Sequence, residues 1–273
     1  MPEGPEIRRA ADTIAEVLEG EVIHTVRFGP PRLRHHARKL RGHRITAIET
    51  RGKALLTHFE HGYSIYSHNQ LYGVWRVVQG HKLPKSNRSM RLLLQTLTHS
   101  AILYSASDIS VWHTPELAVH PFLSRIGPDI MGSTLTWRDI AARLAEKKFN
   151  GKTLATLYLD QTFLAGNGNY LRSEVLHRAR LHPLKKPRDL TRREIGNLAR
   201  KSLSISHRSY DTGGITLAPR LEATLQRQGA SRRQRRFYVF GRAGRPCYQC
   251  GEQIDRVEIA GRRLYLCANC QEA

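Results

Sequence analysis

The sequence predicts an α+β protein of several domains, with an N-terminal β-sandwich and flanking helix, then a helical domain, then a C-terminal β-hairpin zinc finger. Three observations lead to this fold class. Short segments rich in Val, Ile, Leu and Tyr follow one another between residues 22 and 105. The pattern becomes helical after Gly127, Pro128 and Asp129. All four cysteines lie within the last 27 residues.

The first expected element is a helix that begins near Pro5 and ends before Gly20. Proline suits the first turn of a helix, and glycine suits the position after its last turn. Apolar residues recur at intervals of three and four, which places them on one helical face. These residues are Ile7, Ala10, Ala11, Ile14, Val17 and Leu18.

A series of strands is expected to follow this helix. Gly, Pro, Asn or charged residues separate the segments, and such a series is typical of an antiparallel sandwich or barrel. The helix and strands would form a domain over 1–124, followed by a linker at 125–135. The strands are expected at 22–28, 44–50, 53–59, 63–68, 72–78, 91–97 and 101–105.

The next domain is expected to be helical. Thr136 with Asp139, and Thr191 with Glu194, have the spacing of capping boxes, so each pair predicts a helix start. The helix that begins at Thr191 would carry a stripe through Ile195, Leu198, Ala199 and Leu203. The other helices are expected at 136–147, 153–163 and 169–180.

Residues 207–236 are predicted to form a mobile loop, because Gly213, Gly214 and Pro219 interrupt regular structure. A basic run follows, with Arg232, Arg233, Arg235 and Arg236. The loop would complete a domain over 136–236, and residues 237–273 would form the zinc finger.

The composition is strongly basic: 44 Lys and Arg against 23 Asp and Glu give a formal charge of +21. Such a charge favours binding to a polyanion, most often a nucleic acid, with an anionic membrane surface as the rival. A basic ribosome-associated or chromatin-like protein fits the same composition. No apolar run of about 18 residues and no signal-peptide pattern occurs, so we expect a cytoplasmic protein associated with the nucleoid through DNA.

The cysteines are arranged as two pairs, with Cys247 and Cys250 separated from Cys267 and Cys270 by sixteen residues. This spacing predicts a tetrahedral zinc site with a structural role, because four thiolates leave no position open for water. Unrelated reduced cysteines are the alternative. Between the pairs, Ala260 and Gly261 fit the turn of a β-hairpin, and Arg262 just beyond it is either a phosphate contact or a solvated surface residue.

At the other end of the chain, removal of Met1 would expose the secondary amine of Pro2. A free α-amine has a pKa of about 8, so part of it is neutral and nucleophilic at physiological pH. Glu3 could move protons beside it, and its carboxylate would be favoured at a helix N-terminus. Pro-Glu as a simple lead-in to a helix is the alternative.

These features together resemble the formamidopyrimidine-DNA glycosylase and endonuclease VIII superfamily. The resemblance rests on the first seven residues, on the cysteine pairs with the preceding Gly241, Arg242, Gly244 and Pro246, and on internal motifs that occur in the family's order. The internal motifs are Arg51, Gly52 and Lys53, and Gly166, Gly168, Asn169 and Tyr170. The start Pro2, Glu3, Gly4, Pro5 and the segments 49–58 and 66–75 resemble the endonuclease VIII branch, which prefers oxidised pyrimidines.

The resemblance implies a bifunctional DNA glycosylase and abasic-site lyase that acts as a monomer on damaged double-stranded DNA in base excision repair. Pro2 would attack C1′ of the damaged nucleoside and Glu3 would serve as acid and base. Lys53 would contact phosphate and assist the chemistry, and Arg262 would bind phosphate and support δ-elimination. One structural Zn²⁺ ion would be held by the cysteines.

The resemblance also implies DNA contacts. Gln70, Leu71 and Tyr72 match a loop that fills the void left by the everted base, although they also fit core strand positions. Asn169 matches the turn of a helix-two-turns-helix motif, and Arg125 matches an arginine that contacts DNA. Asp129 and Glu174 match acidic positions that organise the site.

Two departures limit the resemblance. Asn167 stands where relatives carry an aliphatic residue, which puts the packing beneath that turn in doubt. The stretch that begins at Gly213 and Gly214 resembles the branch that acts on oxidised purines. An oxidised-purine glycosylase, or a non-catalytic zinc-finger protein that binds DNA damage, is therefore the alternative function.

Overall fold

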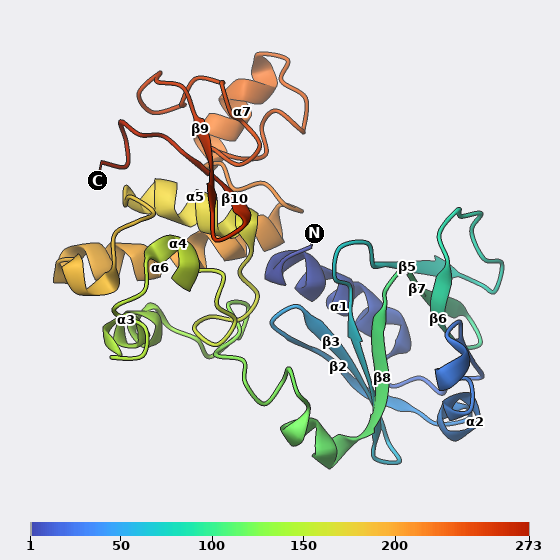
Figure 1. Ribbon diagram of the computed structural model, residues 1–273. Coiled ribbons are helices and arrows are strands. Elements are labelled where there is room, and N and C mark those ends of the chain that lie inside the picture. Colours follow the sequence, from blue (N-terminus) through green and yellow to red (C-terminus); the bar gives the residue numbers. More distant parts are fainter. Residues whose placement is uncertain (1, 273) are drawn as a thin grey trace. The chain divides into compact units, whose positions relative to one another are not determined.

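The computed structural model describes residues 2–272. It divides into two compact units, one with Pro2 and residues 6–125 and the other with Glu3–Pro5 and residues 126–272 (Figure 1). The segment Glu3–Pro5 therefore packs with the second unit, although the rest of its helix belongs to the first. None of the helices within 2–272 is long and apolar enough to cross a membrane.

The first unit is a sandwich of two four-stranded antiparallel sheets, with strand orders β1-β6-β7-β5 and β2-β3-β4-β8. Side chains from both sheets and from helix α1 (Gly4–Leu18) share one apolar core, which confirms the sandwich and its flanking helix. The strands are β1 (Thr25–Phe28), β2 (Ile45–Arg51), β3 (Ala54–Phe59), β4 (Tyr63–His68), β5 (Val74–Gln79), β6 (Met90–Gln95), β7 (His99–Tyr104) and β8 (Asp108–His113).

Strand β8 was not expected from the sequence. In β8, Ile109 and Val111 alternate with the polar Asp108 and Ser110, which is the two-residue period of a strand. The segment was missed because the polar residues before it, Ser105 and Ser107, indicated a loop. Between the strands lie the short helices η1 (Pro31–Leu33), α2 (His36–Leu40) and η2 (Thr114–Val119).

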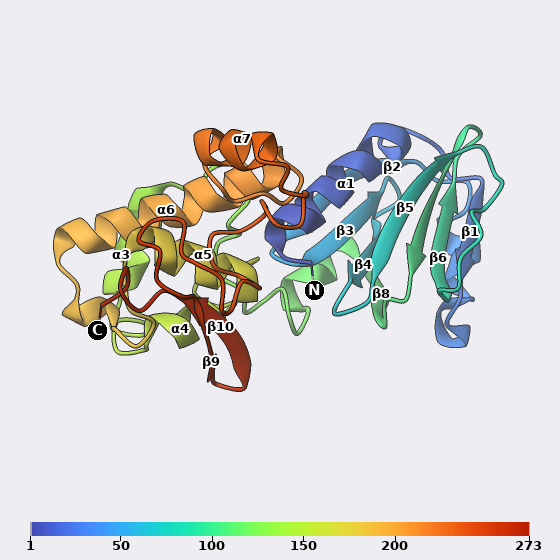
Figure 2. The same cartoon turned by 90° about the horizontal axis from the view of Figure 1, so that it is seen from above.

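The second unit is helical and ends in a hairpin. Both predicted capping boxes are confirmed, at Thr136 before α3 and at Thr191 before α6. Helix α5 lies between α6 and the hairpin, and nearly all of its side chains are buried (Figures 1 and 2). The elements are α3 (Trp137–Ala145), α4 (Leu154–Leu157), α5 (Asn169–Ala179), η3 (Pro187–Asp189), α6 (Arg192–Asp211), α7 (Pro219–Arg227), β9 (Asp255–Ile259) and β10 (Arg262–Leu266).

The helix predicted at 153–163 is shorter than expected, because α4 ends at Leu157. Beyond it, the Asp160 carboxylate accepts hydrogen bonds from the backbone N–H and the hydroxyl of Thr162, at 2.9 and 2.7 Å. A carboxylate that bonds the backbone two residues ahead stabilises a turn in competition with a helix.

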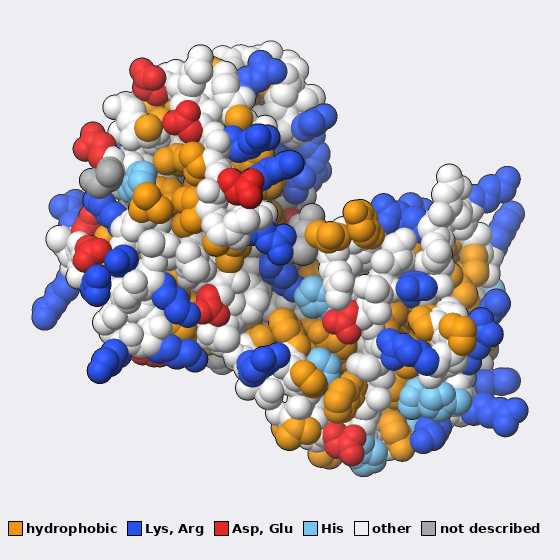
Figure 3. Space-filling model, viewed as in Figure 1, with side chains coloured by type: hydrophobic (Ala, Val, Ile, Leu, Met, Phe, Trp, Pro, Cys, Tyr) orange, Lys and Arg blue, Asp and Glu red, His pale blue; other side chains and the backbone are white. Residues whose placement is uncertain are grey.

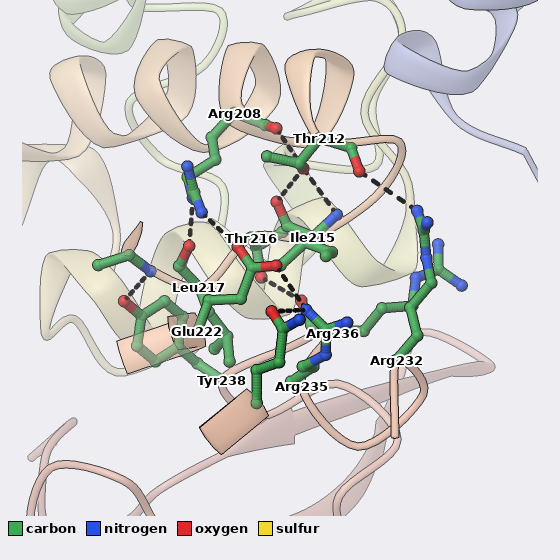
Figure 4. Close-up of polar contacts among 12 residues, drawn as sticks. Arg208, Thr212, Ile215, Thr216, Leu217, Glu222, Arg232, Arg235, Arg236 and Tyr238 are labelled. Atoms are coloured by element: carbon green, nitrogen blue, oxygen red, sulfur yellow. Dashed lines mark hydrogen bonds and ion pairs between the residues drawn. The ribbon is translucent and has the colours of Figure 1, made fainter. Parts of the chain in front are cut away.

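The irregular structure predicted over 207–236 is also wrong in part, because α6 continues to Asp211 and α7 occupies Pro219–Arg227. The Glu222 carboxylate on α7 accepts hydrogen bonds from Arg208 of α6 at 2.8 Å and from Arg235 at 2.9 Å (Figure 4). Arg232 and Arg236 donate to the carbonyls of the two glycines that end the preceding turn. Most of the basic run therefore holds this segment together.

Candidate active site and metal centre

The Glu3 side chain is only 3% exposed and lies at the N-terminus of α5. Its two carboxylate oxygens accept hydrogen bonds from the backbone N–H groups of Tyr170, at 2.9 Å, and Leu171, at 3.2 Å. The first N–H groups of a helix lack intrahelical partners and carry partial positive charge, so they stabilise an anion. The sequence predicted that Glu3 lies at the N-terminus of the first helix. The N–H groups that bind its carboxylate belong instead to α5, 167 residues further along the chain.

Two close contacts of the turn before α5, one to the Gly4 backbone and one to the Glu3 side chain, fix this arrangement. The N–H of Gly4 donates to the carbonyl of Gly166 at 2.8 Å, which attaches the N-terminal segment to the turn before α5. A Cβ added to Gly168 would lie 2.4 Å from Cδ of Glu3, closer than two such carbons can approach. A glycine at position 168 therefore makes room for the Glu3 carboxylate.

Asn167, in the same turn, is 1% exposed, and neither its amide nitrogen nor its amide oxygen has a hydrogen-bond partner among the described residues. An unpaired buried amide costs free energy that an aliphatic side chain would not. The unfavourable packing that the sequence suggested beneath this turn is thus confined to the Asn167 side chain. Asp129 supports the neighbouring chain, because its Oδ1 accepts from the N–H of Met131 at 2.9 Å.

Asn169, Arg172 and Arg262 lie together in this unit. Asn169 begins α5, and its Oδ1 accepts a hydrogen bond from Nη2 of Arg172 at 3.4 Å. Burial lowers the pKa of Arg172 to about 10; the charge of Glu3 opposes this change and that of Arg262 adds to it. Arg262 begins β10 and is exposed. The second unit therefore gathers three predicted site residues around α5, together with Arg172, which was not expected from the sequence.

The Glu174 carboxylate, further along α5, is fully buried and holds the chain that leads into the finger. Its oxygens accept hydrogen bonds from the N–H groups of Tyr238, Val239 and Phe240 at 2.8 to 2.9 Å, and from the Thr216 hydroxyl at 2.5 Å. Burial raises the pKa of Glu174, although each of these donors opposes the rise. The expected organising role of Glu174 thus has a geometric basis.

Pro2 and Lys53 belong to the first unit. Lys53 is 7% exposed, so its interpretation as one more basic surface residue does not hold. Burial lowers the pKa of His68, the Asp108 carboxylate opposes this effect, and the Lys53 ammonium adds to it. The Lys53 ammonium is therefore close enough to act on a half-buried histidine at the end of β4.

The predicted void-filling residues form an exposed turn between β4 and β5. The side chains of Leu71 and Tyr72 are 57% and 69% exposed, so they are not core strand residues. Gln70 adopts a left-handed backbone conformation with φ of 48°, and its N–H donates to Nδ1 of His68 at 3.0 Å. Arg88 donates to the carbonyl of Tyr72 at 2.7 Å. The turn thus presents two large apolar side chains to solvent from a supported backbone.

On the face shown in Figure 3, basic side chains occur on both units and are more frequent than acidic ones. This agrees with the formal charge of +21. Arg125 is exposed at the end of the first unit, and its Nε donates to the carbonyl of Pro121 at 2.7 Å. This hydrogen bond fixes the orientation of the Arg125 guanidinium, which remains exposed to solvent.

The four cysteine sulfurs lie within 4.8 Å of one another, and no other group of metal-binding side chains of this kind occurs within residues 2–272. Sγ of Cys247 is 3.9 Å from that of Cys270, and Sγ of Cys250 is 3.4 Å from that of Cys267. Zinc–sulfur bonds of about 2.3 Å in a tetrahedron place the sulfurs about 3.8 Å apart, so the cluster suits a structural zinc site. Burial raises the pKa of Cys267 and Cys270, and a bound cation would favour their thiolates.

The hairpin between the cysteine pairs is confirmed, with a two-residue turn at Ala260 and Gly261. Both have positive φ, 53° and 67°, as the turn type that matches strand twist requires. The finger also contacts α5, because Nε2 of His177 lies 3.6 Å from Sγ of Cys247. Burial lowers the pKa of His177 to about 4, so the ring is neutral at physiological pH.

Comparison with protein families shows two matches that together cover most of the chain. Residues 1–106 match the formamidopyrimidine-DNA glycosylase N-terminal domain, and residues 126–220 match the formamidopyrimidine-DNA glycosylase H2TH domain. Among curated proteins, Endonuclease 8 of Klebsiella pneumoniae is 45% identical over 99% of this chain and all of its own length. Endonuclease 8 of Salmonella arizonae is 43% identical over the full length of both chains.

Solved structures with the same fold include Lactococcus lactis Fpg bound to DNA that contains N7-benzyl-Fapy-dG, with a TM-score of 0.81, 23% identity and full coverage of both chains. The same Lactococcus protein bound to DNA that contains an oxidised pyrimidine gives the same TM-score, identity and coverage. At this identity the likeness establishes the fold, including the helix-two-turns-helix architecture of the second unit.

Proposed function

Because the chain belongs to the endonuclease VIII branch of the formamidopyrimidine-DNA glycosylase and endonuclease VIII family, it is a DNA glycosylase and abasic-site lyase of base excision repair. We propose that it removes oxidised pyrimidines from double-stranded DNA through a Schiff base on Pro2, acting as a monomer. The observation that carries this proposal is the fixed position of Glu3 at the N-terminus of α5. Because Pro2 directly precedes Glu3, this anchor limits the positions that the Pro2 nitrogen, the proposed nucleophile, can reach.

The chemistry begins once Met1 has been removed. The neutral amine of Pro2 attacks C1′ of the damaged nucleoside, the bond from C1′ to the base breaks, and the base leaves with a proton. Protonation of O4′ opens the sugar and gives an iminium ion between Pro2 and C1′. We assign the exchange of these protons to Glu3, the carboxylate that directly follows Pro2 in the chain.

Two eliminations then cut the strand. Loss of a proton from C2′ expels the 3′ phosphate, and loss of a proton from C4′ expels the 5′ phosphate. Water hydrolyses the remaining iminium and frees Pro2. The positive charge of Lys53 and of Arg262 would stabilise the phosphate groups that leave.

Access to C1′ requires that the base leave the stack, which costs a few kcal/mol. The exposed side chains of Leu71 and Tyr72 would fill the space it leaves, and Gln70 would face the opposite strand. Asn169 and Arg125 would hold the phosphates on either side. One zinc ion on the four cysteines would fold the hairpin that carries Arg262.

Borohydride reduction in the presence of DNA with an abasic site tests the proposal directly. Protein shown by mass spectrometry to begin at Pro2 should form a covalent adduct, and Pro2→Gly or retention of Met1 should greatly reduce it. Correctly processed protein that binds this DNA without an adduct would instead be a sensor of damage.

The lesion preference needs a separate comparison. Cleavage rates on oligonucleotides with thymine glycol, dihydrouracil or 8-oxoguanine should favour the pyrimidines. Faster removal of 8-oxoguanine would support the purine alternative, which the stretch at Gly213 and Gly214 favours. Gly214 has a φ of 104° and lies against the guanidinium of Arg236, so this stretch is part of the ordered segment around α7.

A further inference from the structure

Arg172 is fully buried, with no exposed surface, and none of the steps above uses it. Its Nη1 donates to the carbonyl of Ala155 at 3.0 Å, and its Nη2 donates to the carbonyl of Arg263 at 3.0 Å and to Oδ1 of Asn169 at 3.4 Å. Desolvation of a guanidinium is costly, and an apolar side chain of similar volume would fill the same space at lower cost. A contribution to stability alone therefore does not explain why a guanidinium group is buried at this position.

Arg172 donates a hydrogen bond to a backbone carbonyl on the edge of the hairpin that faces away from β9, that of Arg263. In a hairpin with a two-residue turn, the residues that flank the turn, Ile259 and Arg262, exchange both ladder hydrogen bonds. The peptide groups of the next residue, Arg263, then point away from β9 and toward α5. Arg172 meets this carbonyl, and Oγ of Ser173 accepts from the next outward N–H, that of Tyr265, at 3.2 Å.

Arg172 differs from Ser173 because it also bonds a side chain of the site. One nitrogen, Nη2, contacts both Oδ1 of Asn169 and the carbonyl of the residue that follows Arg262. The Asn169 amide and the backbone of β10 next to Arg262 are thus joined through one nitrogen of the Arg172 guanidinium. Lysine cannot reproduce this planar geometry, although it keeps the charge.

We propose that Arg172 is a positioning residue that sets the spacing between Asn169 and Arg262, so that both reach the phosphates of one bound DNA strand. This inference rests on the proposed DNA-repair function and assigns a further residue to it. Arg172 touches neither DNA nor the reacting atoms. Its effect is transmitted through β10, whose first residue carries the guanidinium that binds phosphate.

The test measures how the affinity for duplex DNA with a tetrahydrofuran abasic analogue depends on salt. This analogue cannot form the Schiff base, so the measurement is independent of the chemistry, which borohydride trapping of the wild-type protein reports separately. Loss of one phosphate contact lowers the slope of log affinity against log salt by about 0.9. Arg262→Ala should show this loss in the wild-type background.

Arg172→Lys should lower the salt slope by the same amount, about 0.9, and weaken binding about tenfold, although it removes no charge. Adding Arg262→Ala to Arg172→Lys should then change the slope little. Ser173→Ala is the matched control, because it removes the other bond to β10 and the hydroxyl bond to the Asn169 backbone carbonyl, at 2.9 Å, but keeps the bond to the Asn169 side chain. It should keep the wild-type slope. The zinc content of each variant should stay at that of the wild type.

A wild-type slope in Arg172→Lys, or an equal loss of slope in Ser173→Ala, would overturn the proposal. If Arg172→Lys does not fold, a double-mutant cycle replaces it, with Asn169→Ala and Arg262→Ala alone and together. Coupled positions should give a combined loss of affinity smaller than the product of the two single losses. Independent losses would overturn the proposal by this route.

Discussion

Gly168→Ala should lower activity far more than stability, because the new methyl group would occupy the place of the Glu3 carboxylate. A Cβ at position 168 would lie 2.4 Å from both Cδ and Oε1 of Glu3 and 2.8 Å from its Cγ. The backbone itself poses no obstacle, since a φ of −147° suits alanine. The flexible end of the glutamate would therefore move, away from the N–H groups of Tyr170 and Leu171.

The two effects differ in size. Two N–H groups at the start of α5 lose a charged partner, which costs roughly 1–3 kcal/mol after partial rehydration. A displaced general acid–base group lowers kcat by about 10²–10⁴-fold. Single-turnover release of base from a lesion-bearing duplex, measured well below the unfolding temperature, separates activity from stability.

Gly151→Ala is the matched control. A methyl group at position 151 would have no heavy atom within 4 Å, and the φ of Gly151 is not positive. Alanine should therefore leave kcat unchanged and add about 0.4–1 kcal/mol of stability. Glu3→Gln gives the expected lower limit of activity. Wild-type kcat in Gly168→Ala would refute the reasoning, because the carboxylate would then work equally well away from α5.

Four further outcomes are expected. Asn167→Leu should raise the free energy of unfolding by about 1–3 kcal/mol in thermal melts, because it removes a buried unpaired amide. Leu71→Ala should slow base excision from duplex DNA far more than cleavage at a preformed abasic site, where no base has to leave the stack. Burial lowers the pKa of His61, so the unfolded chain binds its proton more readily; stability in urea should fall as the pH drops below about 6.5, and His61→Phe should flatten this dependence. Chelation of zinc should abolish the hairpin signal in circular dichroism and weaken DNA binding, as should Cys267→Ser.

Local patterns predicted the elements whose determinants are local. The stripe of α1, the capping boxes at Thr136 and Thr191, and the turn at Ala260 each depend on residues within a few positions of one another. The cysteine spacing likewise predicted a cluster whose sulfurs the structure brings together. In each case the decisive interaction lies within one element or one turn.

The errors occurred where distant side chains decide the structure. Residues 207–236 have the composition of a loop, yet Glu222 on α7 bonds Arg208 and Arg235, 14 and 13 residues away. The anchor of Glu3 at α5 joins residues 167 positions apart, and no periodicity reports it. The signal available for Arg172 was an arginine three residues after Asn169, inside the helix expected at 169–180.

Helix α5 explains why these distant contacts converge. Its first N–H groups hold Glu3, Arg172 in its first turn meets the hairpin, Glu174 binds the backbone of residues 238–240, and His177 near its end contacts Cys247. Of these contacts, those of Arg172, Glu174 and His177 are made to the finger, whereas the anchor of Glu3 is made to α5 alone. Loss of zinc should therefore release the phosphate contact of Arg262 first and leave Glu3 in place, so that affinity for DNA falls before the intrinsic ability of Pro2 to form an adduct at saturating DNA.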